Sequence, residues 1–523
     1  MPRLLRHALA AAMLATALPA AASNPIASVN KLWSFQHLAG RSSEILAYDL
    51  STASLFVAGG NGIEVLGLNG QLKASLDTSA FGGINSISVK NGVLAASFSN
   101  ATVQNPGSVQ FWNTAQFLAG AGHLGGVSVG AVPDMLLWTP DGSRLLVANE
   151  GERQSNAINP EGSISLIQFN AAAPSSSTVS TLGFGAWDGQ EALLRAQGVR
   201  IQAGVSTSIA LEPEYIALSS DGTRAVVTLQ ENNALAFIDL ANPQVTAIRT
   251  LGLKDFSQPG NSIDPSDQDG KLELRSVPVK GLYMPDTIVG FAVGGKSFYA
   301  VANEGDATVD DSDIVRLGNA AVTLDAGVFP DAATLKQNAN LGRLNIVRNG
   351  ATGDGNTTNM TEIVTLGGRS FSIRDENGAL VYDSGDLIER EVMKIDGLYV
   401  DGRSDDKGVE PEGVVVFELG GRQIAAVGLE RTARGALALF DVTDPAQTSF
   451  LQILDTGATT EARIEGLHAF VHEGRYFLAL AAEDPSHRTM LYELTAAPVP
   501  EPAAALLMLV GLGLLGRRLG RTG

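Results

Sequence analysis

Five pairs of carboxylates recur along the chain with nearly constant spacing. In each pair, one acid stands near the start of an apolar run, and a second acid follows a predicted strand sixteen to eighteen residues later. The pairs are Asp134 with Glu150, Glu214 with Glu231, Asp286 with Glu304, Glu412 with Glu430, and Glu465 with Glu483. Oxygen ligands of this kind suit a hard cation, Ca²⁺ before Mg²⁺. If the pairs converge, they form a candidate cation site.

The residues between the two acids of a pair predict two short strands joined by a tight turn. In residues 132–150, for example, an Asp-Gly turn at 141–142 separates two apolar runs. The start and the end of such a hairpin lie side by side. Each repeat should therefore present two acids at one end of its sheet, and a radial arrangement of the repeats would bring these acids together around one mouth of a central channel.

Two weaker positions, Glu44 and Asn85, extend the series to seven. The short spacings between successive first positions are 41, 49 and 53 residues, in the range of a four-stranded propeller blade of about 40–50 residues. We therefore predict an all-β fold, a seven-bladed β-propeller, with six to eight blades compatible with the sequence. Because the first two repeats lack a full acid pair, we expect the acidic arc to be open on one side.

The longer spacings predict loop insertions. One insertion lies between residues 152 and 212 and contains a predicted short helix at Glu191–Ala196. The largest lies between residues 306 and 410, and within it residues 371–383 predict a hairpin that supplies outer strands of the fifth blade.

Composition excludes several classes of partner and site. The formal net charge is −19, so nucleic acid and anionic membranes would be repelled, whereas cations would be attracted. The chain has no cysteine, which removes disulfides, thiolate metal sites and a cysteine nucleophile. The 58 glycines and 6% aromatic residues fit many tight hairpins.

The two ends of the chain predict export. Residues 1–22 combine Arg3 and Arg6 with an Ala/Leu-rich stretch and small residues at the end, as in a cleavable signal peptide. We assign residues 23–497 to the propeller and residues 498–523 to a C-terminal segment with Pro-Glu-Pro at 500–502, an apolar run from Ala503 to Gly516 and a basic end. The apolar run is shorter than the roughly 20 residues that an independent membrane-spanning helix needs.

This C-terminal segment resembles the PEP-CTERM sorting signal. The resemblance implies a processing enzyme of the exosortase type as a partner, transient inner-membrane association through the tail, and delivery to the surface or extracellular matrix of a Gram-negative bacterium. The alternative is an ordinary tail anchor, which would be a transmembrane segment.

Several longer motifs resemble the choice-of-anchor I domain family. They are Gly281-Leu-Tyr-Met-Pro-Asp286, Val301-Ala-Asn-Glu-Gly-Asp306, the Asp- and Glu-rich stretch 401–413, and Val427-Gly-Leu-Glu-Arg431. The resemblance implies a secreted or surface propeller with an interchangeable anchoring tail. Residues 138–149 are also similar to a YVTN-type surface-layer blade.

Three interpretations of the carboxylates remain open. They cap backbone N–H groups at turns, they bind Ca²⁺, or they form a catalytic ring. The sequences at 149–152 and 303–306 are preferred positions, because a glycine there allows two acids to approach each other. The full candidate metal set is Asp134, Glu150, Glu214, Glu231, Asp286, Glu304, Asp306, Glu412, Glu430, Glu465 and Glu483.

The leading functional hypothesis is a noncatalytic, calcium-stabilised interaction module that contacts an extracellular polysaccharide or a surface protein. No motif in the sequence supplies a credible nucleophile. The alternative is a metal-dependent hydrolase, either a calcium-dependent phosphoesterase of the phytase or alkaline-phosphatase kind or a lactonase-like enzyme, which would use the same acids. Lys280, Lys407 and Arg431 are the few basic residues near the motifs that such an enzyme would need for a phosphate.

Overall fold

The computed structural model describes residues 24–498 apart from residues 156, 308–311, 459–461 and 484. The predicted signal peptide and all but the first residue of the predicted sorting signal lie outside the described residues. Among the described helices, none is long and apolar enough to cross a membrane.

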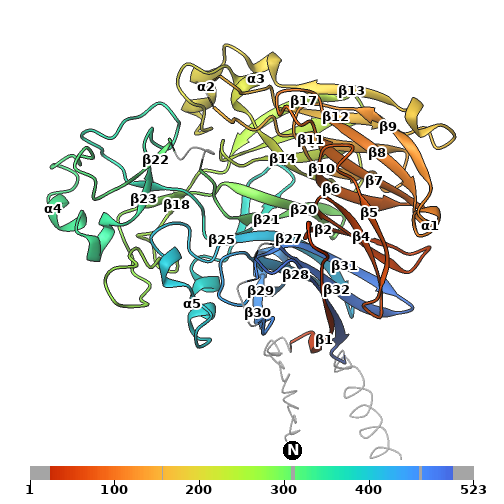
Figure 1. Ribbon diagram of the computed structural model, residues 1–523. Coiled ribbons are helices and arrows are strands. Elements are labelled where there is room, and N and C mark those ends of the chain that lie inside the picture. Colours follow the sequence, from red (N-terminus) through yellow and green to blue (C-terminus); the bar gives the residue numbers. More distant parts are fainter. Residues whose placement is uncertain (1–23, 156, 308–311, 459–461, 484, 499–523) are drawn as a thin grey trace, which may run out of the picture.

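Seven antiparallel sheets of four strands each form the body of the molecule (Figure 1). The first four sheets follow the chain. They are β2 (Arg41–Asp49), β3 (Ser54–Gly60), β4 (Gly62–Gly67) and β5 (Leu72–Asp77); β6 (Gly83–Lys90), β7 (Val93–Ser99), β8 (Ser108–Asn113) and β9 (His123–Ser128); β10 (Pro133–Trp138), β11 (Arg144–Asn149), β12 (Ser163–Gln168) and β13 (Thr178–Gly183); and β14 (Pro213–Leu218), β15 (Arg224–Leu229), β16 (Ala234–Asp239) and β17 (Gln244–Thr250).

The other three sheets include the large insertion and both described ends of the chain. They are β20 (Pro285–Val293), β21 (Lys296–Asn303), β25 (Ser370–Asp375) and β26 (Leu380–Asp383); β27 (Pro411–Leu419), β28 (Arg422–Leu429), β29 (Ala436–Asp441) and β30 (Ser449–Asp455); and β31 (Ile464–His472), β32 (Arg475–Ala482), β33 (Arg488–Ala496) and β1 (Ile26–Gln36). The hairpin predicted at 371–383 is therefore found in the fifth sheet.

The innermost strands form a closed ring. In chain order, each of β2, β6, β10, β14, β20, β27 and β31 contacts the next, and β31 contacts β2. Apolar clusters fill the space between every two neighbouring sheets. Burying both faces of each sheet in this way removes apolar surface from water all around the axis. The fold is a β-propeller.

The two described ends of the chain close the ring together. Strand β1 pairs with β33, so that Ile26 lies opposite Ala496. Just after β1, His37 Nδ1 lies 2.7 Å from Glu64 Oε2, and His37 Nε2 lies 2.8 Å from Thr489 Oγ1. This buried network joins β1, β4 and β33 at the seam between the last and the first sheet.

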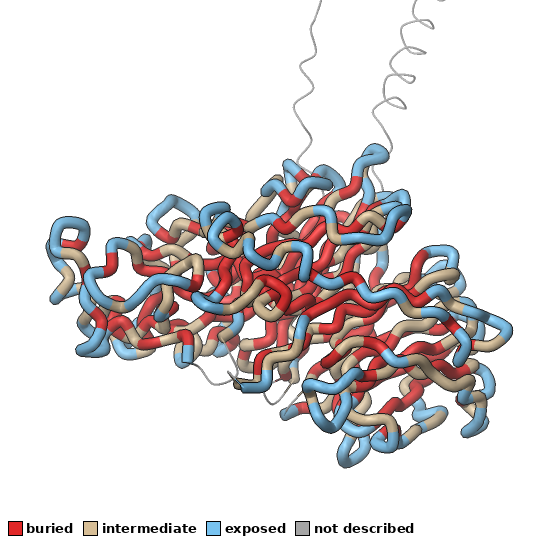
Figure 2. The backbone as a smooth tube through the Cα atoms, turned by 90° about the horizontal axis from the view of Figure 1, so that it is seen from above, coloured by how far each residue is buried: buried red, intermediate tan, exposed pale blue. Residues whose placement is uncertain are grey.

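The insertions form smaller units beside the ring. The predicted helix is present as α2 (Glu191–Ala196), and the other helices are equally short: α1 (Thr114–Phe117), α3 (Thr207–Ala210), α4 (Ala332–Leu335) and α5 (Leu387–Met393). A small sheet of β18 (Leu253–Asp255), β19 (Lys280–Leu282) and β24 (Val364–Thr365) and the pair β22 (Ile314–Arg316) and β23 (Asn345–Val347) accompany a separate apolar cluster around Phe256 and Leu317. Figure 2 shows buried residues concentrated along the sheets and exposed residues at the connecting loops.

Candidate cation site on the propeller axis

A β-bulge interrupts all seven innermost strands at the same place. The irregular steps in pairing span Arg41 to Ile45, Ile84 to Ser86, Pro133 to Met135, Pro213 to Ile216, Pro285 to Ile288, Pro411 to Val414, and Ile464 to Leu467. Each step contains the first position of one repeat, namely Glu44, Asn85, Asp134, Glu214, Asp286, Glu412 and Glu465. A bulge redirects a side chain and leaves its residue out of the regular ladder.

The pairing register explains why the two acids of a repeat meet. Pro285 lies opposite Asn303, so the next residues, Asp286 and Glu304, stand at the same end of the hairpin. The same register places Asn149 opposite Pro133, Leu429 opposite Pro411 and Ala482 opposite Ile464. The predicted side-by-side placement of the acids is thus a property of the hairpins themselves.

The seven bulge residues converge on one cavity of about 250 Å³ at the axis. Eight carboxylates line it, which we call the axial ring: Glu44, Asp134, Glu150, Glu214, Asp286, Glu412, Glu465 and Glu483. The remaining lining residues are Ile45, Asn85, Tyr215 and Thr287. No lysine or arginine of the described chain is among them. Asn85 is the neutral member of the seven, and there the acidic arc is interrupted.

Burial and mutual repulsion raise the proton affinity of the axial ring. Burial, followed by the charges of Glu152 and Glu44, raises the pKa of Asp134 to about 7. Burial and the neighbouring Glu483 raise the pKa of Glu465 to about 10. Burial is also the main reason that the pKa of Glu214 and the pKa of Asp286 lie well above their usual values. Taking carboxylates out of water next to one another disfavours the charged form unless a cation compensates it.

Two fully buried oxygen atoms of the axial ring have no hydrogen-bond partner among the described residues. They are Oε2 of Glu214 and Oε2 of Glu412. Glu214 is only 8% exposed. A buried carboxylate oxygen without a partner loses the free energy of its interaction with water, so this geometry favours a bound ligand that supplies positive charge.

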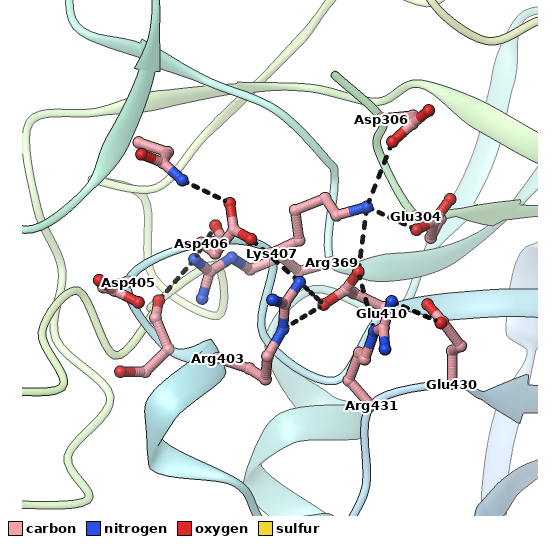
Figure 3. A network of polar contacts seen from close by, with 12 residues as sticks. Glu304, Asp306, Arg369, Arg403, Asp405, Asp406, Lys407, Glu410, Glu430 and Arg431 are labelled. Carbon is pink, nitrogen blue, oxygen red and sulfur yellow. Dashed lines mark hydrogen bonds and ion pairs between the residues drawn. The ribbon is translucent and has the colours of Figure 1, made fainter. Parts of the chain in front are cut away.

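A second group of carboxylates lies beside the axial ring and is compensated by cations (Figure 3). Lys407 Nζ lies 2.7 Å from Glu304 Oε1, 3.0 Å from Glu410 Oε2 and 3.7 Å from Asp306 Oδ1. Arg403 Nε donates to Glu410 Oε1 at 2.9 Å, and Arg431 Nη2 lies 2.7 Å from Glu430 Oε1. We call these seven residues the Lys407 cluster: Glu304, Asp306, Arg403, Lys407, Glu410, Glu430 and Arg431. Lys407 and Glu410 are buried.

The structure corrects the predicted ring in one respect. Of the second members of the pairs, Glu150 and Glu483 reach the axial cavity, whereas Glu231, Glu304 and Glu430 do not line it. Glu231 lines a separate pocket together with Arg153 and Arg200. Glu304 and Asp306 belong to the Lys407 cluster because the insertion brings Lys407 to them, whereas Glu430 belongs to it through Arg431, its neighbour in the chain. Beyond the basic residues noted in the sequence, Arg463 Nε also approaches Glu430 Oε1, at 3.8 Å.

One trio of carboxylates connects the two groups. Glu304, Glu412 and Glu430 each offer an oxygen atom, and these atoms lie within 4.8 Å of one another. Glu412 belongs to the axial ring and the other two to the Lys407 cluster. Glu44 and Glu410 are absent from the predicted metal set. The weaker repeat signal identified the position of Glu44, whereas nothing in the spacing singles out Glu410.

Comparison with known proteins identifies the family. Residues 44–445 match the model of the choice-of-anchor I domain. The chain belongs to the choice-of-anchor I domain family. This confirms the resemblance found in the motifs. The match spans the first five sheets and the first three strands of the sixth. No match was found among curated proteins.

Two solved structures are similar to this choice-of-anchor I protein at low identity. One is the β-propeller domain of Myceliophteria thermophila Cps50 (Swd1), with 10% identity, a TM-score of 0.45, and 90% of this chain and 100% of that chain covered. The other is Kuenenia stuttgartiensis hydrazine synthase, with 11% identity, a TM-score of 0.46, and 87% of this chain and 96% of that chain covered.

The C-terminal residues 498–521 match the PEP-CTERM protein-sorting motif. This motif implies recognition by a processing enzyme of the exosortase type. Together with the choice-of-anchor I domain, it identifies an exported propeller protein that is sorted to the bacterial cell surface.

Proposed function

We propose that this surface propeller is a noncatalytic interaction module of the extracellular matrix of a Gram-negative bacterium, and that Ca²⁺ bound in the axial ring stabilises it. The carrying observation is that eight carboxylates and no described lysine or arginine line one cavity of about 250 Å³. Partners of this module are an extracellular polysaccharide or a surface protein.

The donor set favours Ca²⁺ over Mg²⁺. Ca²⁺ accepts six to eight oxygen ligands in flexible geometry, whereas Mg²⁺ requires a nearly ideal octahedron and keeps several waters. The axial ring offers carboxylates from six of the seven innermost strands, together with the side-chain oxygens of Asn85 and Thr287. A large number of carboxylate oxygens held on a rigid scaffold fits Ca²⁺, the larger of the two ions.

A comparison of melting temperature in Ca²⁺ and in chelator tests this proposal. We expect Ca²⁺ to raise the melting temperature, since a ligand at a hundred times its Kd stabilises the folded state by about 2.7 kcal/mol. The double variant Glu214→Gln/Asp286→Asn should lose the response. Glu418→Gln is the matched control, because Glu418 lies exposed on β27, the strand that carries Glu412. Equal melting in Ca²⁺ and chelator, with no heat of calcium binding, would refute the proposal.

A second candidate function rests on the trio Glu304, Glu412 and Glu430. A metal held there would lie close to Arg431 and Arg463, which could receive a phosphate or the carboxylate that forms when a lactone is hydrolysed. This arrangement supports a metal-dependent phosphoesterase or lactonase. Calcium-dependent turnover of phosphate esters or lactones that Glu412→Gln abolishes and Glu418→Gln retains would establish this function in place of the noncatalytic one.

A further inference from the structure

The axial cavity continues into an apolar segment of the channel. A second cavity of about 400 Å³ shares four lining residues with the axial cavity, namely Ile45, Tyr215, Thr287 and Glu465. Beyond these shared residues, its lining is almost wholly apolar. The channel therefore has a strongly acidic section followed directly by a hydrophobic one.

The innermost strands supply the apolar lining with runs of consecutive residues, such as 215–218 on β14 and 287–290 on β20. On β10, Leu136 is buried in the cluster between the second and third sheets, while its neighbours Met135 and Leu137 remain partly exposed and line the cavity. On β20, Val289 is partly exposed in the same way, next to the buried Ile288. Alternate side chains point to opposite faces of each sheet and pack in the two neighbouring apolar clusters, while the unpaired edge of the innermost strand faces the axis.

This apolar section is not needed for a bare metal ion. Ca²⁺ would be satisfied by the oxygen atoms of the axial ring, and side chains such as Met135, Leu137 and Val289 offer it no ligand. When a hydrophobic group covers apolar surface that is open to a cavity, the free energy of the complex is lowered. The two sections together match a molecule that carries a positive head and a hydrophobic stem.

We infer that the channel binds an organic cation, an ammonium or guanidinium group on an apolar stem. The head lies among the carboxylates of the axial ring, where Glu214 Oε2 lacks a partner, and the stem lies against Met135, Leu137 and Val289. Tyr215 lines both sections and places an aromatic ring at their junction, where it can interact with the cationic head. The inference rests on the proposed function in one respect, since both require the axial ring to take up positive charge.

Calorimetry with a series of alkylammonium ions tests the inference on the unmodified protein. Butyl-, hexyl- and octylammonium are titrated in calcium-free buffer, with hexanol and hexanoate as matched neutral and anionic probes. We expect affinity to rise about fourfold for each added methylene, because one buried methylene contributes about 0.8 kcal/mol. Hexanol should bind at least tenfold more weakly than hexylammonium, and hexanoate should not bind.

Two variants separate the head from the stem. Glu214→Gln should weaken the binding of every alkylammonium ion by a similar factor. Leu137→Asn should instead reduce the gain in affinity for each added methylene. Leu380→Asn is the matched control, because Leu380 is 48% exposed on the outer strand β26. The melting temperature of each variant shows whether it is folded, and the chain-length series on the unmodified protein does not depend on them.

The outcomes distinguish this inference from the calcium proposal. Affinity that is independent of chain length, or no ammonium binding while Ca²⁺ binds, overturns the inference and leaves the calcium proposal standing. Ammonium binding with chain-length dependence but without calcium binding supports the inference and refutes the calcium proposal. No binding of either cation refutes both.

Discussion

The axial ring and the Lys407 cluster are neighbouring groups of carboxylates that differ in whether lysine and arginine side chains compensate their negative charge. In the Lys407 cluster, lysine and arginine side chains contact Glu304, Glu410 and Glu430 directly. In the axial ring, no described lysine or arginine lines the cavity. The difference indicates that ion pairs within the chain neutralise the Lys407 cluster, whereas the acids of the axial ring are neutralised by protons or by the bound cation that we propose.

The two groups also arise from different parts of the chain. Six of the eight acids of the axial ring lie at the bulge that recurs in the innermost strands, and Glu150 and Glu483 follow the second strands of their sheets. The cations of the Lys407 cluster come chiefly from residues 401–410 at the end of the large insertion, with Arg431 following β28. An insertion between the fourth and sixth sheets has thus neutralised one side of the acidic mouth and left the axis acidic.

Removing the central cation of the Lys407 cluster should have the largest effect. Lys407→Met leaves Glu304 and the buried Glu410 without their shared partner, and breaking a buried ion pair costs about 3–5 kcal/mol. The free energy of unfolding in urea measures the loss. Lys394→Met is the control, because Lys394 pairs with Glu391 at the surface, where such pairs contribute about 0–1 kcal/mol. Equal losses in the two variants would remove the distinction between the groups.

Neutralising acids of the axial ring should act in the opposite direction. In chelator, Glu214→Gln/Asp286→Asn relieves repulsion among buried carboxylates, and we expect stability to rise by about 1–3 kcal/mol. Urea unfolding in chelator measures this change. A loss of stability comparable to that of Lys407→Met would show that the axial acids are structural partners of groups within the chain.

An acid at position 85, the neutral position of the axial ring, should increase the difference in charge compensation between the axial ring and the Lys407 cluster. Asn85 donates from Nδ2 to Ser99 Oγ at 2.8 Å and to the Pro133 carbonyl at 3.2 Å. Asn85→Asp removes these donors and adds a ninth carboxylate to the cavity, so the chelated protein should lose about 1–2 kcal/mol. Calcium affinity should increase several-fold, as measured by calorimetry. An unchanged affinity would argue against cation binding at the axis.

The smallest effect concerns acid and lies outside both groups. Burial lowers the pKa of His468 to about 4, and its Nε2 accepts a hydrogen bond from the Tyr48 backbone N–H at 3.3 Å. Because the folded-state pKa lies below the unfolded value of about 6.5, this histidine contributes stability above pH 6.5 that is lost as the pH falls towards 4. Relative to a variant without this histidine, we expect the unmodified protein to lose about 1 kcal/mol between pH 7 and pH 5.5, while protonation of the axial ring acts in the opposite direction in both proteins.

Urea unfolding at the two pH values in chelator checks this prediction. The variant His468→Gln removes this titration, so on acidification its stability should rise relative to that of the unmodified protein by about 1 kcal/mol. An identical change in the two proteins would place the acid sensitivity elsewhere. The axial ring and the Lys407 cluster are therefore best compared at pH 7 or above.

Much of the fold follows from local patterns. Alternating apolar residues and turns such as Gly294-Gly295, where both residues have positive φ, define the hairpin of β20 and β21 from the sequence alone. The hairpin predicted at residues 371–383 and the helix predicted at Glu191–Ala196 also rest on neighbouring residues, and both are present. The closure by β1 was not predicted, because strands from opposite ends of the chain leave no local signal of their pairing.

The sequence predicted that the site consists of carboxylates, but it predicted only in part which carboxylates line the cavity. The spacing of sixteen to eighteen residues identified the acids at the ends of each hairpin, since register is a short-range property. It could not show that a bulge directs Glu44 to the axis in an incomplete repeat, or that Lys407 reaches Glu304 across more than a hundred residues of chain.

The sequence by itself determined that this protein is a propeller with repeated acid pairs and a surface-sorting tail, because hairpins, turns and sorting motifs are read from neighbouring residues. The tertiary structure decided which acids remain without a cation. Compensation depends on distances between side chains that are remote in sequence, and only the closed ring and the folded insertion set those distances.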